Sequence, residues 1–536
     1  MQLIRGYLTR TNSLAVVLET AITIAFLGLL VALVLLQANP LTTLPSRDGG
    51  GYAYIGHIIL EGKLPYIYAW DSKPPGLFYL DAFALWLGQG TRWGIWLMEY
   101  IFLLAATGIG YKLMRNLWRS GAAIFGTIIW LLGLNAVLSG GNFTEEYPLL
   151  FNFLALYCFW KNLQNPKNKI FDFIIGLTFA LSFLFRANTI GVQITILLTW
   201  CIVLLVKNEI TLLLKKLALM LVAALLVITV ACAYFWAKGA LYPMIEAALL
   251  YNFYYGEHAN LWSGIIKGFE YLGSVAWVAL VGYIITVRQL ILGYKVKAVD
   301  NIALLLMIGW PVEIVLSALS GRGYGHYYIA WLPVVALLSG MLFSVLVPQI
   351  FLPGVINFLN ARVKYALFIL LVVSVIVFNG GLVTYWDSFS RILFDRGAGI
   401  ENTPPVVQYV RNNTDPGDKV LVWGAQVGLN FMAHRDSPTA YIFYPLYVDS
   451  PFTAKMETSF LSDLENQPPA LIIDAYIHDP DNVLSLNPDV RSAQILAGKG
   501  QTYQPPNLAQ VFDFIQSHYK MEVVIGDYSI YRIHNP

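Results

Sequence analysis

The sequence predicts a multi-pass α-helical membrane protein that carries a soluble α/β domain at its C-terminus. Of its 536 residues, 57% are hydrophobic and only 12% are charged, whereas a soluble protein has about 25% charged residues. A water-facing globule cannot bury so much apolar surface. The net charge is also uneven, since residues 1–385 have a net charge of +9 and residues 386–536 have −7. We therefore divide the chain into a membrane domain, 1–386, and an outer domain, 387–536.

Eleven apolar runs are candidates for membrane-spanning helices, which need roughly 20 residues to cross a bilayer. The first, Leu14 to Leu36, is longer than the apolar core of a signal peptide, which has about 7–15 residues, so we expect a retained helix. The other runs lie near 93–113, 120–138, 146–160, 170–185, 189–206, 217–236, 270–287, 301–319, 327–347 and 365–384. The stretch 76–88 is too short to span easily, and we expect it to lie at the membrane surface as a helix.

Basic residues between the runs predict the orientation through the positive-inside rule. With a cytoplasmic N-terminus, the inner loops contain 16 of the 24 Lys and Arg residues of the membrane domain. Eleven spans then place the outer domain outside the cytoplasm, and we expect a bacterial plasma membrane. Strand and helix patterns alternate in the outer domain, which favours a small α/β fold. The strands are expected at 419–425, 470–475 and 521–533, and the helices at 406–413 and 507–519.

Several classes of function have no signal in the chain. The three cysteines, Cys158, Cys201 and Cys232, lie inside apolar runs, so we expect no disulfide framework or metal cluster. The sequence contains no P-loop, no glycine fingerprint for a nucleotide in the outer domain, no zinc motif and no basic stripe for nucleic acid. We therefore expect no nucleotide cofactor and no nucleic-acid partner.

Two charged residues in the long first outer loop, 37–92, are candidates for chemistry. Asp48 precedes a helical pattern in LPSRDGGGYAYIGHIIL. A carboxylate near the membrane surface suits a general base or a ligand of Mg²⁺ or Mn²⁺, but the same position also suits a helix N-cap. Lys73 in DSKPPG stands before a helix that begins with proline. Its ammonium group suits a phosphate partner, or it simply extends to the lipid headgroups.

Two further outer segments bring charged groups to the same membrane face. In NFTEEYP, Glu145 and Glu146 begin a helix, where acids also favour the helix dipole. Neighbours on a helix point about 100° apart, so at most one of the two faces the same cavity as the first-loop acid. In GRGYGHYY, Arg322, His326 and Tyr327 suit either a phosphate headgroup or an interfacial aromatic belt with an anchoring arginine. An acid site beside a phosphate site predicts a lipid-phosphate substrate that enters from the bilayer.

Taken together, these motifs resemble those of the GT-C membrane glycosyltransferases, particularly the protein O-mannosyltransferase and aminoarabinose-transferase branch. The matching parts, over residues 1–340, are RDGGGYAYIGHIILEGKLPY, WDSKPPG, NFTEEY and the late GHYY turn. The resemblance implies an inverting transfer of sugar from a polyprenyl- or dolichyl-phosphate donor. It places the transfer outside the cytoplasm, and we expect a glycan, a lipid or a protein as acceptor.

The resemblance also implies roles for individual residues. Asp48 would be the first-loop acid, acting as a base or a metal ligand, and Glu145 or Glu146 would be the second acid. Donor contacts would come from Lys73, Arg322 and His326. Some mannosyltransferases have an Asp-Glu pair at the first site, but here Asp48 is followed by Gly49. The chain therefore lacks a second acid at this position.

Two other functions stay open at the level of the sequence. An O-antigen ligase or polymerase also uses lipid-linked glycans outside the cytoplasm, but that class depends on a large later loop with basic residues. A lipid or solute transporter often has two related halves and polar groups near the bilayer midplane. This chain shows no repeat of one half in the other, and the acids within its helices, such as Glu19, Glu99 and Glu313, are scattered.

Overall fold

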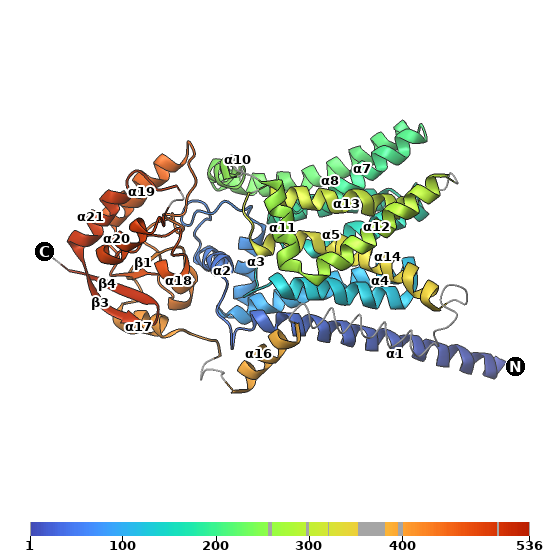
Figure 1. The fold of residues 1–536 in the computed structure, drawn as a ribbon, viewed down its shortest axis with the longest axis horizontal. Helices are drawn as coiled ribbons and strands as arrows, with labels where there is room; N and C mark the ends of the chain where they lie inside the picture. The colour runs from blue at the N-terminus through green and yellow to red at the C-terminus, as the bar shows by residue number, and fades with distance from the viewer. Residues whose placement is uncertain are drawn as a thin grey trace.

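The fold consists of a bundle of long helices and a smaller domain built around a β-sheet (Figure 1). The computed structural model describes residues 2–255, 260–295, 300–319, 321–351, 381–394, 400–500 and 503–534. In these residues, six helices are long and apolar enough to cross a membrane. The prediction of a multi-pass helical membrane protein is therefore confirmed.

Ten of the eleven predicted membrane runs coincide with helical segments. The first run belongs to α1 (Gln2–Val34). The next two runs are the two halves of α4 (Arg92–Val137), which is kinked at Arg119, where φ is +75°. The following helices are α5 (Pro148–Gln164), α6 (Lys169–Phe185), α7 (Gly191–Val206), α8 (Ile210–Ala237), α12 (Ser274–Lys295), α13 (Asn301–Ala318) and α14 (Leu332–Phe351). The run at 365–384 lies almost entirely outside the described residues, so the count of eleven spans stays a prediction.

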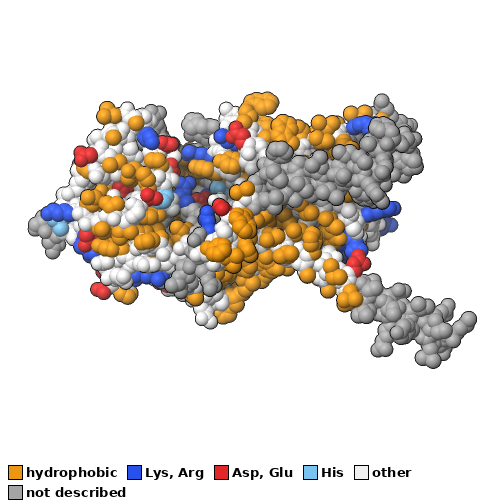
Figure 2. All heavy atoms as spheres, turned by 60° about the horizontal axis from the view of Figure 1, so that its bottom comes forward, with side chains coloured by type: hydrophobic (Ala, Val, Ile, Leu, Met, Phe, Trp, Pro, Cys, Tyr) orange, Lys and Arg blue, Asp and Glu red, His pale blue; other side chains and the backbone are white. Residues whose placement is uncertain are grey.

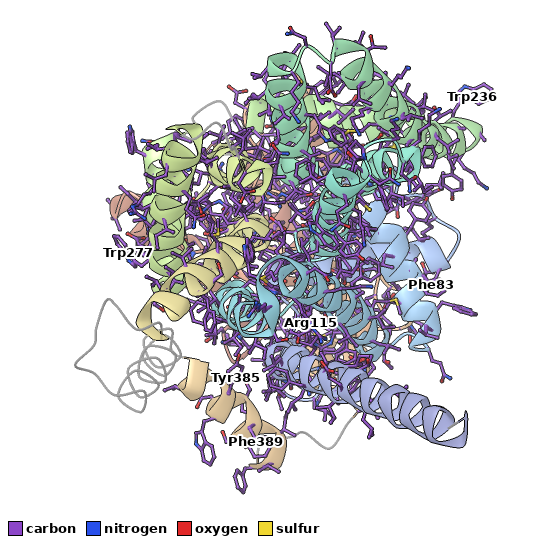
Figure 3. All side chains as sticks on the ribbon, turned by 90° about the vertical axis from the view of Figure 1, so that its right-hand side faces the viewer. Phe83, Arg115, Trp236, Trp277, Tyr385 and Phe389 are labelled. Atoms are coloured by element: carbon purple, nitrogen blue, oxygen red, sulfur yellow. The ribbon has the colours of Figure 1, made fainter. Side chains whose placement is uncertain are left out.

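Large apolar side chains point outwards around the bundle. Trp236 and Trp277 project away from it (Figure 3) and are 73% and 59% exposed. Phe83 also points outwards, from α3 (Gly76–Leu87), which coincides with the surface helix predicted at 76–88. Figure 2 shows hydrophobic side chains as a broad band over the visible face of the helical part. This apolar band suits contact with lipid rather than water.

The first outer loop folds into α2 (Arg47–Leu60) and α3, which pack against each other. Ser46 is the N-cap of α2, because its hydroxyl oxygen accepts a hydrogen bond from the backbone N–H of Gly49 at 2.9 Å. The alternative interpretation of Asp48 as the N-cap is therefore wrong. Asp48 lies in the first turn of the helix instead, and its carboxylate has other neighbours.

The smaller domain contains a four-stranded sheet with the order β1-β2-β4-β3. β1 (Val420–Trp423) and β2 (Leu471–Asp474) are parallel and fully buried. β4 (Tyr528–Ile533) pairs in the antiparallel sense with β2 and with β3 (Tyr519–Ile525). The single strand predicted at 521–533 is instead a hairpin, since the chain turns at Gly526, whose φ of +58° suits glycine.

The smaller domain contains five helices beside this sheet, and the rest of the chain contains several shorter elements. The helices of the smaller domain are α17 (Pro405–Asn413), α18 (Gly428–Ala433), α19 (Thr453–Asn466), α20 (Pro488–Leu496) and α21 (Leu508–His518). The other elements are η1 (Leu35–Ala38), α9 (Leu241–Ile245), η2 (Glu246–Leu250), α10 (Tyr251–Tyr255), α11 (Leu261–Leu272), η3 (Gly325–Trp331), α16 (Gly381–Phe394) and η4 (Tyr476–His478). The domain boundary predicted between residues 386 and 387 falls inside α16.

The two domains meet at the first outer loop. The backbone N–H of Trp70 donates a hydrogen bond to the carbonyl of Ala440 at 2.8 Å. On α2, Gly50 faces Gly428 of α18 so closely that a Cβ atom on Gly50 would lie 2.8 Å from the Cα atom of Gly428. Only a glycine lets the two helices approach to this distance.

We expect Gly50→Ala to lower the free energy of unfolding by about 1–3 kcal/mol, the usual effect of overpacking a tight contact. The measurement is thermal unfolding of the purified protein in detergent. Gly108→Ala is the matched control, because a Cβ atom there meets nothing within 4 Å. Equal melting temperatures for the two variants would contradict the close packing of the domains.

Candidate active site

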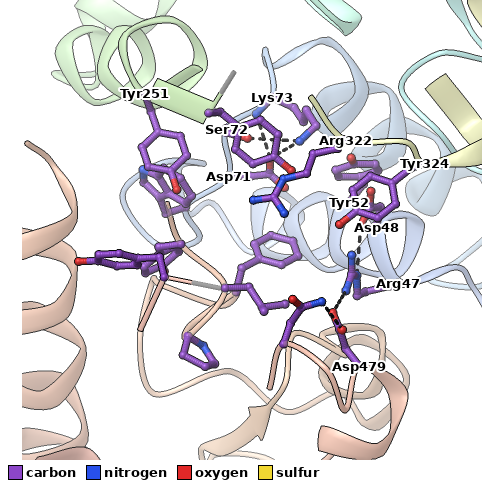
Figure 4. Close-up of a pocket in the computed structure, with 18 of the residues that line it drawn as sticks. Arg47, Asp48, Tyr52, Asp71, Ser72, Lys73, Tyr251, Arg322, Tyr324 and Asp479 are labelled. Carbon is purple, nitrogen blue, oxygen red and sulfur yellow. Dashed lines mark hydrogen bonds and ion pairs between the residues drawn. The ribbon is translucent and has the colours of Figure 1, made fainter. Parts of the chain in front are cut away.

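A pocket lies where the membrane helices, the first outer loop and the C-terminal domain meet (Figure 4). It contains about 930 Å³ of empty space, a volume that includes open solvent at its mouth. Four residues predicted from the sequence lie on its walls: Asp48, Lys73, Arg322 and Tyr327. They come from segments far apart in the chain, and the fold brings them to one cavity.

Asp48 faces the pocket from the first turn of α2, and its side chain is 26% exposed. Its carboxylate oxygens lie 3.8 Å from Nε2 of His326 and 3.7 Å from Nε of Arg47. Burial by itself raises the pKa of Asp48, but the charges of His326 and Arg47 outweigh burial and hold the pKa below its usual value. Lys73 and Arg186 act in the same direction. The carboxylate is therefore ionised at neutral pH.

His326 stands behind Asp48 rather than on the pocket wall. Its ring is stacked between Phe143, at 4.5 Å between centroids, and Tyr324, at 5.8 Å. Its Nε2 atom also lies 3.9 Å from a carboxylate oxygen of Glu145. The imidazole thus bridges the two predicted acids, and the stacked rings fix its orientation.

Arg186 completes this cluster, although the sequence analysis did not single it out. Its Nη1 atom pairs with Glu145 at 2.6 Å, and its Nε donates to Asn188 at 2.8 Å. The guanidinium also lies 4.2 Å from the ring centre of Tyr327. One feature of the sequence could have identified Arg186. It lies at the predicted outer end of α6, where the positive-inside rule makes a basic residue unusual.

Glu145 and Glu146 have different surroundings, and neither of them is among the residues that line the pocket. Glu146 accepts a hydrogen bond from the backbone N–H of Phe143 at 2.8 Å and lies beside Glu99, not beside Asp48. Glu145 therefore belongs to the cluster around Asp48, whereas Glu146 holds the loop that precedes α5.

Asn142 is the centre of that loop and is buried, with 5% exposure. Its φ is +59°. Its side-chain amide donates to Asp81 at 2.7 Å and to the carbonyl of Gly49 at 3.3 Å, while its oxygen accepts from the hydroxyl of Tyr147 at 2.8 Å. Because Gly49 adjoins Asp48, these contacts fix the start of α2.

Lys73 is held on the pocket wall by the DSKPPG turn. Its backbone N–H donates to Asp71 at 2.9 Å, and its ammonium lies 3.8 Å from the same oxygen and 3.2 Å from the hydroxyl of Ser72. Asp71 is only 3% exposed, and this burial raises its pKa although Lys73 opposes the shift. The two prolines that follow fix the direction of the turn.

Arg322, in the turn before η3, extends into the pocket (Figure 4). Its guanidinium lies 5.4 Å from the ring centre of Tyr255. Lys73 and Arg322 therefore place two cationic groups on the same cavity as the ionised Asp48.

The C-terminal domain supplies the wall that the sequence analysis missed. Phe443, Leu446, Tyr447 and Tyr503 line the pocket, and Asp479 pairs with Arg47 at 3.0 Å. No motif in the outer domain pointed to these residues, because only the folded chain brings them to the first outer loop.

The residues present do not fit the divalent cation that the sequence analysis considered at Asp48. Within the described ranges, no three His, Cys, Asp or Glu side chains come together as a metal site. Glu145 already pairs with Arg186, and the neighbours of Asp48 are basic.

We expect Arg186→Gln to lower the free energy of unfolding by about 3–5 kcal/mol, because it leaves the buried carboxylate of Glu145 without its cation. Thermal unfolding in detergent measures the change. Arg115→Gln is the matched control, since Arg115 pairs with Glu19 at the same distance, 2.6 Å, but on the surface, where such pairs contribute about 0–1 kcal/mol. A loss for Arg186→Gln no larger than that of the control would contradict the burial of the pair.

Known proteins share parts of this sequence and fold. Residues 72–236 match the family model described as dolichyl-phosphate-mannose-protein mannosyltransferase. The crystal structure of ArnT from Cupriavidus metallidurans bound to undecaprenyl phosphate matches at 13% identity and a TM-score of 0.59, over 96% of this chain and 98% of that one. The Archaeoglobus fulgidus oligosaccharyltransferase in complex with Zn and sulfate matches at 16% identity and a TM-score of 0.52, over 84% of this chain and 67% of that one. The comparison with curated proteins gives no match.

At these identities the structural likeness concerns the fold, and it extends over both domains of the chain. The matched family segment begins one residue before Lys73 and continues through α8. The resemblance drawn from the motifs is thus confirmed: the chain has the GT-C fold of integral membrane glycosyltransferases, and its residues 72–236 are similar to the dolichyl-phosphate-mannose-protein mannosyltransferase family model.

Proposed function

We propose that the protein is an inverting glycosyltransferase, which moves a sugar from a polyprenyl-phosphate donor to an acceptor hydroxyl on the extracytoplasmic face of the membrane. The observation that carries this proposal is the placement of Asp48, Lys73 and Arg322 around one pocket. A carboxylate and two cations on one cavity suit a reaction in which a hydroxyl loses its proton and a phosphate departs.

The donor is a sugar linked to a polyprenyl phosphate. Lys73 and Arg322 provide positive charge for the phosphate, and Tyr327 adds a hydroxyl to the same wall. Two of the similarities to known proteins support a polyprenyl-phosphate donor. The solved ArnT structure holds undecaprenyl phosphate, and the family model that includes Lys73 is named for a dolichyl-phosphate sugar.

In the proposed step, the carboxylate of Asp48 accepts the proton of the acceptor hydroxyl as its oxygen attacks the anomeric carbon. The bond between that carbon and the phosphate oxygen breaks on the opposite face, so the configuration inverts. The polyprenyl phosphate leaves with additional negative charge, which Lys73 and Arg322 stabilise. We assign His326 and Glu145 to holding Asp48 in place, because both lie behind it.

The acceptor reaches Asp48 between the two domains. The C-terminal domain forms this side of the pocket with Phe443, Leu446, Tyr447 and Tyr503. Aromatic side chains with a polar tip bind ligands that have both apolar and hydroxyl-bearing faces. This wall supports a role for the C-terminal domain in the choice of acceptor.

We expect Asp48→Asn to lower kcat by about 10²–10⁴-fold, because a positioned general base contributes about that much to a rate. The assay offers a panel of radiolabelled polyprenyl-phosphate sugars to membranes that contain the protein, and parallel samples contain a chelator. Asp415→Asn, at an exposed site of the outer domain, is the control and should keep full activity.

The outcomes of this assay are distinct. Full transfer by Asp48→Asn at normal expression would reject the role as base, and no transfer by the wild type from any donor would count against the proposed function. Loss of wild-type activity in the chelator samples alone would show that a cation takes part despite the poor fit of the described residues.

We expect Lys73→Ala to raise the apparent KM for the donor about 10- to 100-fold, since a charge-assisted hydrogen bond contributes about 1.5–3 kcal/mol. Donor titration of the transfer rate measures it. Lys238→Ala, at an exposed site after α8, should leave the donor KM unchanged. A normal donor KM for Lys73→Ala would remove Lys73 from the phosphate site.

A further inference from the structure

Arg47 connects the catalytic acid of the membrane domain to a carboxylate of the C-terminal domain. Its Nη1 atom donates a hydrogen bond to Oδ2 of Asp479 at 3.0 Å, and its Nε atom lies 3.7 Å from Oδ1 of Asp48. Dashed lines in Figure 4 mark both interactions. One guanidinium thus serves two carboxylates that lie 431 positions apart in the chain.

Asp479 is itself held in a rigid turn. Its Oδ1 atom accepts a hydrogen bond from the side-chain amide of Asn482 at 2.7 Å, and its backbone carbonyl accepts from the N–H groups of Asn482 and Val483. The turn follows η4, directly after the buried strand β2. Both carboxylate oxygens of Asp479 therefore have fixed partners, and the sheet determines where the group lies.

Arg47 lies closer to Asp479 than to Asp48, and this difference leaves the oxygens of Asp48 accessible. At 3.0 Å, Arg47 is within hydrogen-bonding distance of Asp479, whereas at 3.7 Å it makes only an electrostatic contact with Asp48. The guanidinium keeps Asp48 charged without occupying its oxygens. Those oxygens stay available for a hydroxyl group in the pocket.

We propose that Asp479 is a positioning residue of the catalytic centre: through Arg47 it holds in place the charge that keeps Asp48 ionised, so the C-terminal domain is a required part of the active site. This inference rests on the proposed function, because it assumes that Asp48 is the base. It goes beyond acceptor choice, since it assigns the C-terminal domain a share in the chemical step.

The experiment compares Asp479→Ala with Asp481→Ala in the same turn, where Asp481 is 77% exposed and pairs with Lys499. We expect Asp479→Ala to lower kcat about 10- to 100-fold, as for the loss of a charge-assisted hydrogen bond, with an unchanged donor KM. Arg47 lowers the pKa of Asp48, so a loosened Arg47 should move the acidic limb of kcat to higher pH. A raised donor KM or an unmoved limb would overturn the proposal.

A double-mutant cycle separates positioning from general damage. If Asp479 acts through Arg47, then Asp479→Ala combined with Arg47→Gln should lose no more activity than the worse of the two single variants. Losses that multiply would show independent effects and overturn the proposal. Asp479→Glu should recover part of the rate, because it restores the carboxylate.

Hydrogen exchange tests the positioning role of Asp479 without any measurement of sugar transfer. Hydrogen exchange of residues 46–52 should become faster in Asp479→Ala than in Asp481→Ala, because the first turn of α2 loses its anchor. If the wild type transfers no sugar, the proposed function fails, and the exchange result still decides the contact. Unchanged exchange would overturn the positioning role. Should Asp479→Ala not fold, Asp479→Asn, which keeps the shape, takes its place.

Discussion

The site depends on one constraint, which is that a carboxylate at the edge of a membrane needs positive charge close by to stay ionised. Asp48 satisfies this constraint with Arg47, and Glu145 satisfies it with Arg186 at 2.6 Å. Burying an ion without a partner costs several kcal/mol. The cations beside the two acids are therefore as much part of the site as the acids themselves, and they come from the first turn of α2 and from the residue that follows α6.

Charge pairing also holds the two domains together at the first outer loop. The first outer loop carries charged groups that face away from the helical bundle, and the C-terminal domain provides partners for them: Asp479 for Arg47, and Asp436 for Lys63 at 2.7 Å. The close approach of α2 and α18 at Gly50 brings these partners within reach. Packing and charge pairing thus hold the pocket together at one surface.

Features that depend on a local sequence pattern could be predicted, whereas contacts between residues far apart in the chain could not. Apolar runs predicted the helices, and the charged motifs predicted an acid site beside a phosphate site at one membrane face. In the structure, Asp48, Lys73 and Arg322 line one cavity. The hairpin at 519–533 was missed because a single glycine interrupts an otherwise continuous strand pattern. The opposite directions of Glu145 and Glu146, the role of Arg186 and the contribution of Asp479 all require three-dimensional contacts, which spacing along the chain does not contain.

The buried loop around Asn142 has a practical consequence for producing the protein. Asn142, Phe143 and Thr144 form an N-glycosylation sequence, yet Asn142 and Thr144 are 5% and 0% exposed, and the amide of Asn142 binds Asp81 and Gly49. A host that attaches glycans to nascent chains would compete with folding at this asparagine. A glycan added there would separate the loop from the start of α2, so a host without this modification is the suitable one for expression.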